Sequence, residues 1–396
     1  MGRSPHGTPG GTMDVIHPAI THEPTRRWLA EAGPPAPHEL MRFTRLVEGT
    51  AVTVSHLVGE EHDPADLDPY VAGLVAVGHL PVETLDAQDV VVDGETGRVF
   101  ALQMFAPEYA EIFPLAPSLE ALGRLLGAVD ELKALRGRFA DLAERRGTGV
   151  VREASERLLA LFAEEGGGGA EEVPAFWRIA ALIRPMALVA RPGRGLRLDL
   201  PARFLEDEFG AEQIVRVAPA AMPAALEHGP TRRFLAEVGL PRDGLMFGLG
   251  ERETLLETLR QERERLGAEP ALRHLGLTDR LPPDADRLLV LGGLVHDLDV
   301  VVDGRTGEVH YLECGAGTVT PVNADVSTLA FSVWMHSREQ RIDKEHDLTG
   351  DFYHQLADAM VAVLASVDPV ACLPATGPDD YRYWPEVFHD EAGGVL

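Results

Sequence analysis

Two groups of acidic residues and histidines in the second half of the chain have the types and spacing that a metal ion requires. The first group contains His296, Asp297, Asp299 and Asp303. Alternation along a strand would place Asp297 and Asp299 on one face, with Cβ atoms roughly 7 Å apart. Paired carboxylates of this kind can bind a metal. Asp303 also has a purely structural explanation, because an Asp-Gly pair readily begins a turn.

The second group contains Glu345, His346, Asp347, Asp351 and His354. Asp347, Asp351 and His354 would share one helix face, because their spacing is i, i+4 and i+7. Two histidines and two aspartates could hold zinc. The alternative is a solvated acidic loop that enters a helix with Asp351 as its N-cap. The first half of the chain has no comparable group, so we predict neither a metal nor a cofactor.

The sequence lacks the common catalytic signatures. It contains no GxxxxGK(S/T), no GxGxxG after a strand, no HExxH, no GxSxG and no HxE with a later PCxxC. Its two cysteines, Cys314 and Cys372, do not form a CxxC pair. We therefore predict that the chain is not an enzyme, and the rival hypothesis is a metal-dependent hydrolase that uses the aspartates and histidines above.

Acidic charge is the outlying property of the composition. The net charge is −27, and residues 337–396 carry twelve acidic and four basic residues. Such a chain repels nucleic acid and anionic membranes and attracts basic proteins. Trp334 has no aromatic counterpart in the first half, and tryptophan is favoured in binding hot spots. The predicted partner-contacting residues are Asp297, Asp299, Trp334, Asp347, Asp351, Asp379, Asp380 and Glu386. The alternative is a charged surface that only confers solubility.

The elements that must position these residues occur twice. Residues 22–35 and 228–241 are identical at ten of fourteen positions, and so are residues 89–102 and 299–312. The offsets, 206 and 210, are nearly equal, which indicates a tandem duplication. We predict one repeat over 14–195 and a more complete one over 196–396. The two repeats are expected to pack together as an intramolecular pseudo-dimer.

Each repeat has an α+β pattern, with a meandering, mostly antiparallel sheet flanked by helices. Proline in the first turn and glycine at the stop delimit a helix in each PTRR block. The Asp-Gly and Thr-Gly pairs predict a β-hairpin turn. The remaining predictions are strands at 71–77, 288–294 and 214–217, helices from Leu119 and Val326 with Ser118 and Asp325 as N-caps, closing helices at 152–163 and 352–365, a flexible loop at 164–172, and an opening helix at 201–209 that the first repeat lacks. Trp28, Trp177 and Trp384 are predicted core residues.

The order of these motifs resembles a known family. The blocks HxPTRRFLxEVGLP, LGGL, DVVVDGxTGxV, PVNxDVSTLAFS and YWPEV resemble the SUKH superfamily, and more narrowly its fourth immunity-protein subfamily. The resemblance covers residues 200–387 and, more loosely, residues 14–177. The first repeat departs from the pattern, since it carries PLAPS where the second carries PVNADVS.

The resemblance implies an α+β fold without an active site. It implies a protein that binds a cognate toxin, typically a nuclease or a nucleic-acid deaminase, and blocks its active site or substrate groove. Contact residues vary with the toxin, so none is carried over. Other members of the superfamily are interaction or regulatory modules, which leaves a scaffold as the alternative. The first twenty residues lack the apolar core of a signal peptide, so we expect a cytoplasmic protein. Because of its acidic charge, we expect it to bind neither nucleic acid nor membrane.

Overall fold

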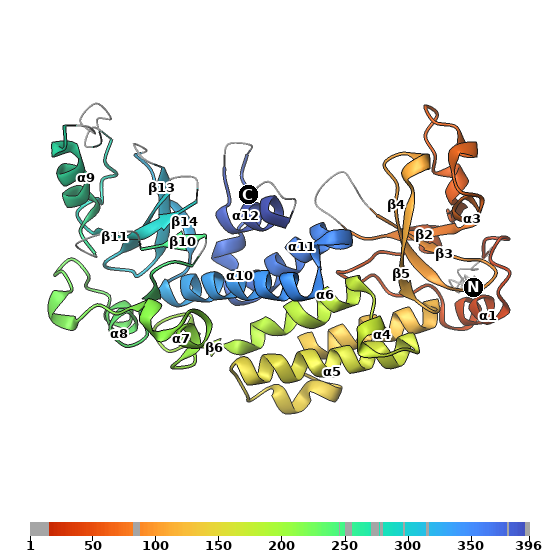
Figure 1. Cartoon of the computed structure of the whole chain (residues 1–396), viewed down its shortest axis with the longest axis horizontal. Coiled ribbons are helices and arrows are strands. Elements are labelled where there is room, and N and C mark those ends of the chain that lie inside the picture. Colours follow the sequence, from red (N-terminus) through yellow and green to blue (C-terminus); the bar gives the residue numbers. More distant parts are fainter. Residues whose placement is uncertain are drawn as a thin grey trace, which may run out of the picture. The chain divides into compact units, whose positions relative to one another are not determined.

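The computed structural model describes residues 16–81, 88–244, 246–249, 256–270, 277, 280–295, 298–313, 317–377 and 380–392 (Figure 1). The chain forms two compact units. Unit 1 consists of Met1–Arg138 and Arg157–Arg178, and unit 2 consists of Phe139–Glu156 and Ile179–Leu396. These units do not coincide with the predicted repeats, because residues 139–156 and 179–195 belong to unit 2. A hydrogen bond from the Gly147 N–H to the Val189 carbonyl (3.1 Å) joins these two segments.

Each unit contains one five-stranded antiparallel sheet, with its strands in chain order (Figure 1). This arrangement confirms the predicted α+β class and the meander. The sheet of unit 1 contains β1 (Val52–Thr53), β2 (Val75–His79), β3 (Asp89–Val92), β4 (Val99–Gln103) and β5 (Glu111–Ala116). The sheet of unit 2 contains β10 (Phe247–Gly248), β11 (Leu288–Leu294), β12 (Leu298–Asp303), β13 (Val309–Glu313) and β14 (Thr320–Asn323).

The two sheets share a bulge at the same place. The register shifts between Ala76 and Gly78 in β2 and between Val290 and Gly292 in β11. A Cβ atom on Gly78 would lie 2.1 Å from the Arg42 carbonyl oxygen, and one on Gly292 would lie 2.3 Å from that of Gly248. Only glycine lets the neighbouring backbone approach so closely. The duplication has therefore preserved the strand geometry together with the residue that the bulge requires.

The helices of unit 1 and the adjoining segments are α1 (Glu23–Ala32), α2 (Thr44–Glu48), α3 (Pro69–Gly73), α4 (Leu119–Lys133), α5 (Thr148–Gly166) and α6 (Ala175–Ile183). Those of unit 2 are α7 (Phe204–Phe209), α8 (Gly229–Glu237), α9 (Leu259–Ala268), α10 (Val326–His346), α11 (Thr349–Val367) and α12 (Tyr383–Ala392). The short strand pairs are β6 (Arg191–Pro192) with β7 (Leu198–Asp199), and β8 (Ile214–Val215) with β9 (Leu240–Pro241). None of the described helices combines the length and the apolar character that a membrane span needs.

The predicted helix starts at Leu119 and Val326 are confirmed. The Ser118 hydroxyl accepts from the Ala121 N–H at 3.1 Å. The Asp325 carboxylate accepts from the N–H groups of Ser327 (2.8 Å) and Thr328 (3.3 Å). Each side chain satisfies backbone donors that the first helical turn leaves free. The opening helix of the second repeat is also confirmed, as α7.

Two predicted elements differ from the structure in type over part of their length. The strand predicted from Val71 begins at Val75, because the Asp68 side chain accepts from the N–H groups of Tyr70 and Val71 and starts α3 instead. Pro69 supports that helix start by supplying a helical φ. The loop predicted at 164–172 is partly helical, since α5 continues through Gly166 and a 3₁₀ turn covers Ala170–Glu172. Residues 1–15, which bear on the missing opening helix of the first repeat, lie outside the described residues.

The predicted core tryptophans Trp177 and Trp384 are fully buried, whereas Trp28 is half-buried. The Trp177 indole N–H donates to the Leu115 carbonyl at 2.7 Å. The Trp384 indole N–H donates to Asn323 Oδ1 at 3.0 Å. In each unit, therefore, the tryptophan ties a late helix to the last strand of the sheet.

A histidine and a threonine at the start of α1 and α8 hold the hairpin turn of the sheet. His22 Nδ1 and the Thr25 hydroxyl are 2.9 Å apart, and His228 Nδ1 and the Thr231 hydroxyl are 2.8 Å apart. The backbone N–H of His22 also donates to the Gly94 carbonyl at 2.7 Å. Gly97 follows in the same turn, with a φ of +78°.

Gly97→Ala is expected to lower the free energy of unfolding of unit 1 by about 2–3 kcal/mol, because it adds a steric conflict to an unfavourable φ. The new Cβ atom would lie 2.4 Å from His22 Nδ1 and 2.7 Å from the Thr25 hydroxyl. Gly49→Ala is the control: its φ is +68°, and no described atom lies within 4 Å of the added Cβ. The control should lose only about 1–2 kcal/mol in urea unfolding. Equal losses for the two variants would mean that the histidine and threonine do not restrict the turn.

Candidate functional site

The first predicted metal group is only partly described, since His296 and Asp297 lie outside the described residues. Asp299, on β12, forms an ion pair with Arg263 of α9. Asp303 is buried at the end of the same strand. Within the described ranges, no three His, Cys, Asp or Glu residues are grouped so that they could hold a metal ion.

Asp303 organises the hairpin turn. Its Oδ1 accepts from the N–H groups of Arg305 (2.9 Å) and Thr306 (3.1 Å), and its Oδ2 accepts from Arg287 Nε (2.8 Å). Burial disfavours the charged carboxylate, but the hydrogen bonds from Arg287 and from the turn outweigh it and hold the pKa of Asp303 below its usual value. Asp93 makes equivalent turn contacts with Glu95 (2.9 Å) and Thr96 (3.2 Å) in unit 1. The turn explanation therefore accounts for both aspartates.

The second predicted metal group surrounds the junction of α10 and α11. Asp347 is exposed and ends α10 with a left-handed φ of 50°. The assigned α11 begins at Thr349, two residues before the predicted cap Asp351, and its backbone is non-helical at Phe352, the residue after Asp351. Asp343, from the preceding helix, accepts from the Thr349 N–H at 2.8 Å and supplies the capping interaction.

Trp334 is 1% exposed and lies within the core of unit 2. Its ring centroid is 4.8 Å from that of Phe204 and 5.9 Å from that of Phe331. A side chain in this position presents no surface to a partner. The suggestion that Trp334 is a surface hot spot is therefore corrected to a core role.

The acidic candidates near the C-terminus differ in their surroundings. Asp380 is half-buried, where its Oδ2 accepts from the Thr376 N–H (2.7 Å) and from Arg382 (2.6 Å). Hydrogen bonds from Thr376 and Arg382 lower the pKa of Asp380. Glu386, on α12, is exposed, and Asp379 lies outside the described residues. Of the predicted residues, Asp299 and Asp380 form ion pairs within unit 2, Trp334 packs in the core, and Asp347 and Glu386 are exposed.

Two exposed aromatics that lie close together in the sequence were not predicted. Phe105 is 63% exposed and Tyr109 is 70% exposed, and both lie in the connection between β4 and β5. The signal was present in the comparison of the repeats, because the corresponding connection of the second repeat, residues 314–319, reads CGAGTV.

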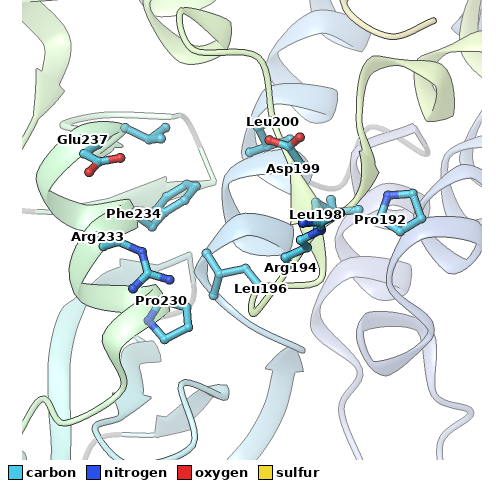
Figure 2. Close-up of a pocket in the computed structure, with 12 residues that line it drawn as sticks. Pro192, Arg194, Leu196, Leu198, Asp199, Leu200, Pro230, Arg233, Phe234 and Glu237 are labelled. Atoms are coloured by element: carbon cyan, nitrogen blue, oxygen red, sulfur yellow. The ribbon is translucent and has the colours of Figure 1, made fainter. Parts of the chain in front are cut away.

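Unit 2 contains an open cavity of about 390 Å³ between α8 and the β6–β7 hairpin. Figure 2 shows Arg233 and Glu237 on α8 across from Arg194 and Leu196 in the hairpin turn. Asp199, at the rim, forms an ion pair with Arg146. The lining combines apolar side chains with charges of both signs, and its two carboxylates belong to Asp199 and Glu237.

Comparison with family models gives one result that covers both halves of the chain. The model described as SUKH-4 immunity protein matches residues 12–165 and again residues 200–390. Comparisons with curated proteins and with solved structures give no match. The two matched regions contain the two sheets and most of the helices described above. Because together they span well over half of the sequence, the chain belongs to the SUKH-4 immunity protein family, with its domain present twice.

Proposed function

We propose that this chain binds and neutralises a cognate toxin that acts on nucleic acid, of the nuclease or deaminase type. The toxin would be blocked in the cytoplasm, by contact and without a catalytic step. The observation that carries the proposal is the immunity-family match over both repeats. No cofactor and no metal take part in the proposed action.

The charge of the chain supports a basic partner. A toxin that acts on nucleic acid has a basic groove for that polyanion. The net charge of −27 attracts such a groove, because the chain and the nucleic acid both present negative charge to it. In unit 2, we propose Asp347, Asp351, Asp379, Asp380 and Glu386 as contacts. Asp297 and Asp299 stay in the proposed set, although the ion pair of Asp299 with Arg263 gives it a structural role as well.

Co-expression tests the function directly. A toxin domain encoded beside the gene of this chain would be expressed with and without the chain, and survival of the host cells would be counted. Rescue, together with a one-to-one complex of the purified proteins, is the expected result. Failure of the chain to bind or to rescue would favour the alternative, a regulatory scaffold.

Charge reversal on unit 2 is expected to weaken toxin binding in a salt-dependent way. Glu345 and Glu386 are exposed helical positions, so Glu345→Lys/Glu386→Lys changes charge without disturbing the left-handed Asp347. We expect about a tenfold rise in Kd at low salt and a much smaller rise at 0.5 M salt, roughly as screening of exposed charges requires. Glu31→Lys/Glu48→Lys, at exposed positions of unit 1, is the matched control. A rise in Kd that does not depend on salt would contradict electrostatic steering.

A further inference from the structure

The β4–β5 connection of unit 1 exposes two large aromatic side chains at close sequence spacing. Phe105 and Tyr109 are 63% and 70% exposed. Aromatic side chains bury a large apolar area when a partner covers them, at roughly 25 cal/mol per Å². Tyrosine is also among the residue types enriched at hot spots, and phenylalanine is enriched at interfaces. This pair is therefore a candidate centre for a protein interface.

The β4–β5 connection is anchored to the core of unit 1 by buried and half-buried neighbours of the aromatic pair. Met104, Ala110 and Ile112 pack against a buried cluster that includes Leu67, Val71 and Leu102. Pro107 is buried and begins a 3₁₀ turn, Pro107–Tyr109, in which the Tyr109 N–H donates to the Ala106 carbonyl at 3.0 Å. An anchored backbone limits the conformational entropy that the connection itself loses on binding.

Acidic residues border the aromatic pair. A second 3₁₀ turn, Pro64–Asp66, contacts the Pro107–Tyr109 turn, and Leu67 next to it belongs to the same buried cluster. The segment around this turn, residues 59–68, has no Lys or Arg, and its carboxylates are all exposed: Glu60, Glu61, Asp63, Asp66 and Asp68. Glu108 and Glu111, in and after the aromatic turn, are exposed as well.

The second repeat shows that the fold does not require these residues. Its β13 and β14 correspond to β4 and β5, and they occupy the same places in a sheet of the same strand order. The connecting residues 314–319, CGAGTV, contain no aromatic and no acidic residue. Exposed aromatics that one repeat carries and the other lacks are best explained by a binding role of that repeat.

We propose that Phe105, Tyr109 and the acidic residues of 60–68 form a docking surface for a basic protein face with an apolar recess at its centre. The charge selects the occupant, since an acidic rim repels nucleic acid and anionic lipid and attracts lysine and arginine. The inference rests on the proposed function, because it takes the occupant to be the toxin. The aromatic pair supplies affinity through burial, and the rim supplies the association rate.

The test measures the affinity of the full chain for the purified toxin domain encoded beside its gene. Phe105→Ala/Tyr109→Ala is expected to raise Kd about 100-fold at low and at high salt alike, as loss of hot-spot side chains does. Glu60→Lys/Glu61→Lys is expected to raise Kd about tenfold at low salt only. Val47→Ala/Leu373→Ala, which truncates side chains that are 61% and 42% exposed, is the control and should bind like the wild type.

The outcomes separate this surface from the function on which it rests. Wild-type chain that fails to bind the toxin domain contradicts both proposals. Wild-type chain that binds, with an unchanged Kd for Phe105→Ala/Tyr109→Ala, overturns the docking surface and leaves the immunity function standing. All variants are expected to melt at the wild-type temperature, because the substituted side chains are exposed. A fall in melting temperature of the aromatic variant alone would give these side chains a structural role and overturn the proposal.

Discussion

Trp384→Ala is expected to destabilise unit 2 by about 4 kcal/mol, the range of large-to-small changes at buried tryptophan. The side chain is fully buried, and its ring lies tilted toward that of Phe388, with ring centroids 5.8 Å apart. Its removal leaves a cavity and also removes the hydrogen bond that the indole N–H donates to Asn323 Oδ1. Thermal unfolding monitored by calorimetry measures the effect on the transition of unit 2.

Asn323 transmits that loss to a buried polar network. Its Nδ2 donates to Asp368 Oδ2 at 3.0 Å and to the Ser332 hydroxyl at 3.1 Å. Asp368 is fully buried and also accepts from the Ala324 N–H at 2.9 Å. A network of this kind orders the end of β14 against α10 and the residue that follows α11, and each unpaired buried member costs about 1–3 kcal/mol.

Trp177 provides a matched control, because it occupies the equivalent place in unit 1 but donates to the Leu115 backbone carbonyl. Trp384→Phe and Trp177→Phe both retain most of the apolar volume. We expect Trp384→Phe to be the more destabilising by about 1 kcal/mol, since it leaves a side-chain amide and its network unsatisfied. If the two phenylalanine variants lose equal stability, the Asn323 network contributes nothing beyond the single hydrogen bond.

The sequence predicted the elements whose signals are local. The DVVVDG blocks became β3 and β12 because β-branched residues and an Asp-Gly turn act over a few neighbouring positions. Ser118 and Asp325 became caps for the same reason. The sequence did not indicate that α11 begins as early as Thr349, where Asp343 of the preceding helix accepts from the Thr349 N–H and hydroxyl. The residue at which α11 begins depends on the turn between α10 and α11, which residue spacing alone does not specify.

The candidate site was predicted less well because burial is a tertiary property. Residues 326–336 of α10 are buried on all sides, so the helix has no polar face there that would mark Trp334 as internal. Phe105 and Tyr109 show the opposite error, because they are exposed where the sequence suggests burial. Aromatics near a strand end suggest core packing, and only the assembled sheet shows that their side chains stay outside.

Arg263→Met is expected to destabilise unit 2 by about 3 kcal/mol, because it breaks an ion pair in a poorly hydrated site. The Arg263 and Asp299 side chains are 5% and 16% exposed. In unit 1, Asp89 at the corresponding strand position pairs instead with Arg45 of α2, at 3.6 Å, with side chains 33% and 25% exposed. Arg45→Met should therefore cost about 1 kcal/mol or less, as expected for a pair in contact with water. Urea unfolding of the two variants gives the comparison.

The pair also decides how binding data on Asp299 must be interpreted. Asp299→Asn alone leaves the Arg263 guanidinium buried without its counter-charge, so toxin binding can fall through lost folding rather than a lost contact. Arg263→Met/Asp299→Leu removes both charges and should recover most of the stability, since burial of apolar side chains replaces the ion pair. If this double variant is stable and still binds the toxin domain with wild-type affinity, Asp299 acts only within the fold. If it is stable and binds weakly, the Arg263–Asp299 pair contributes to toxin binding itself and not only to the fold.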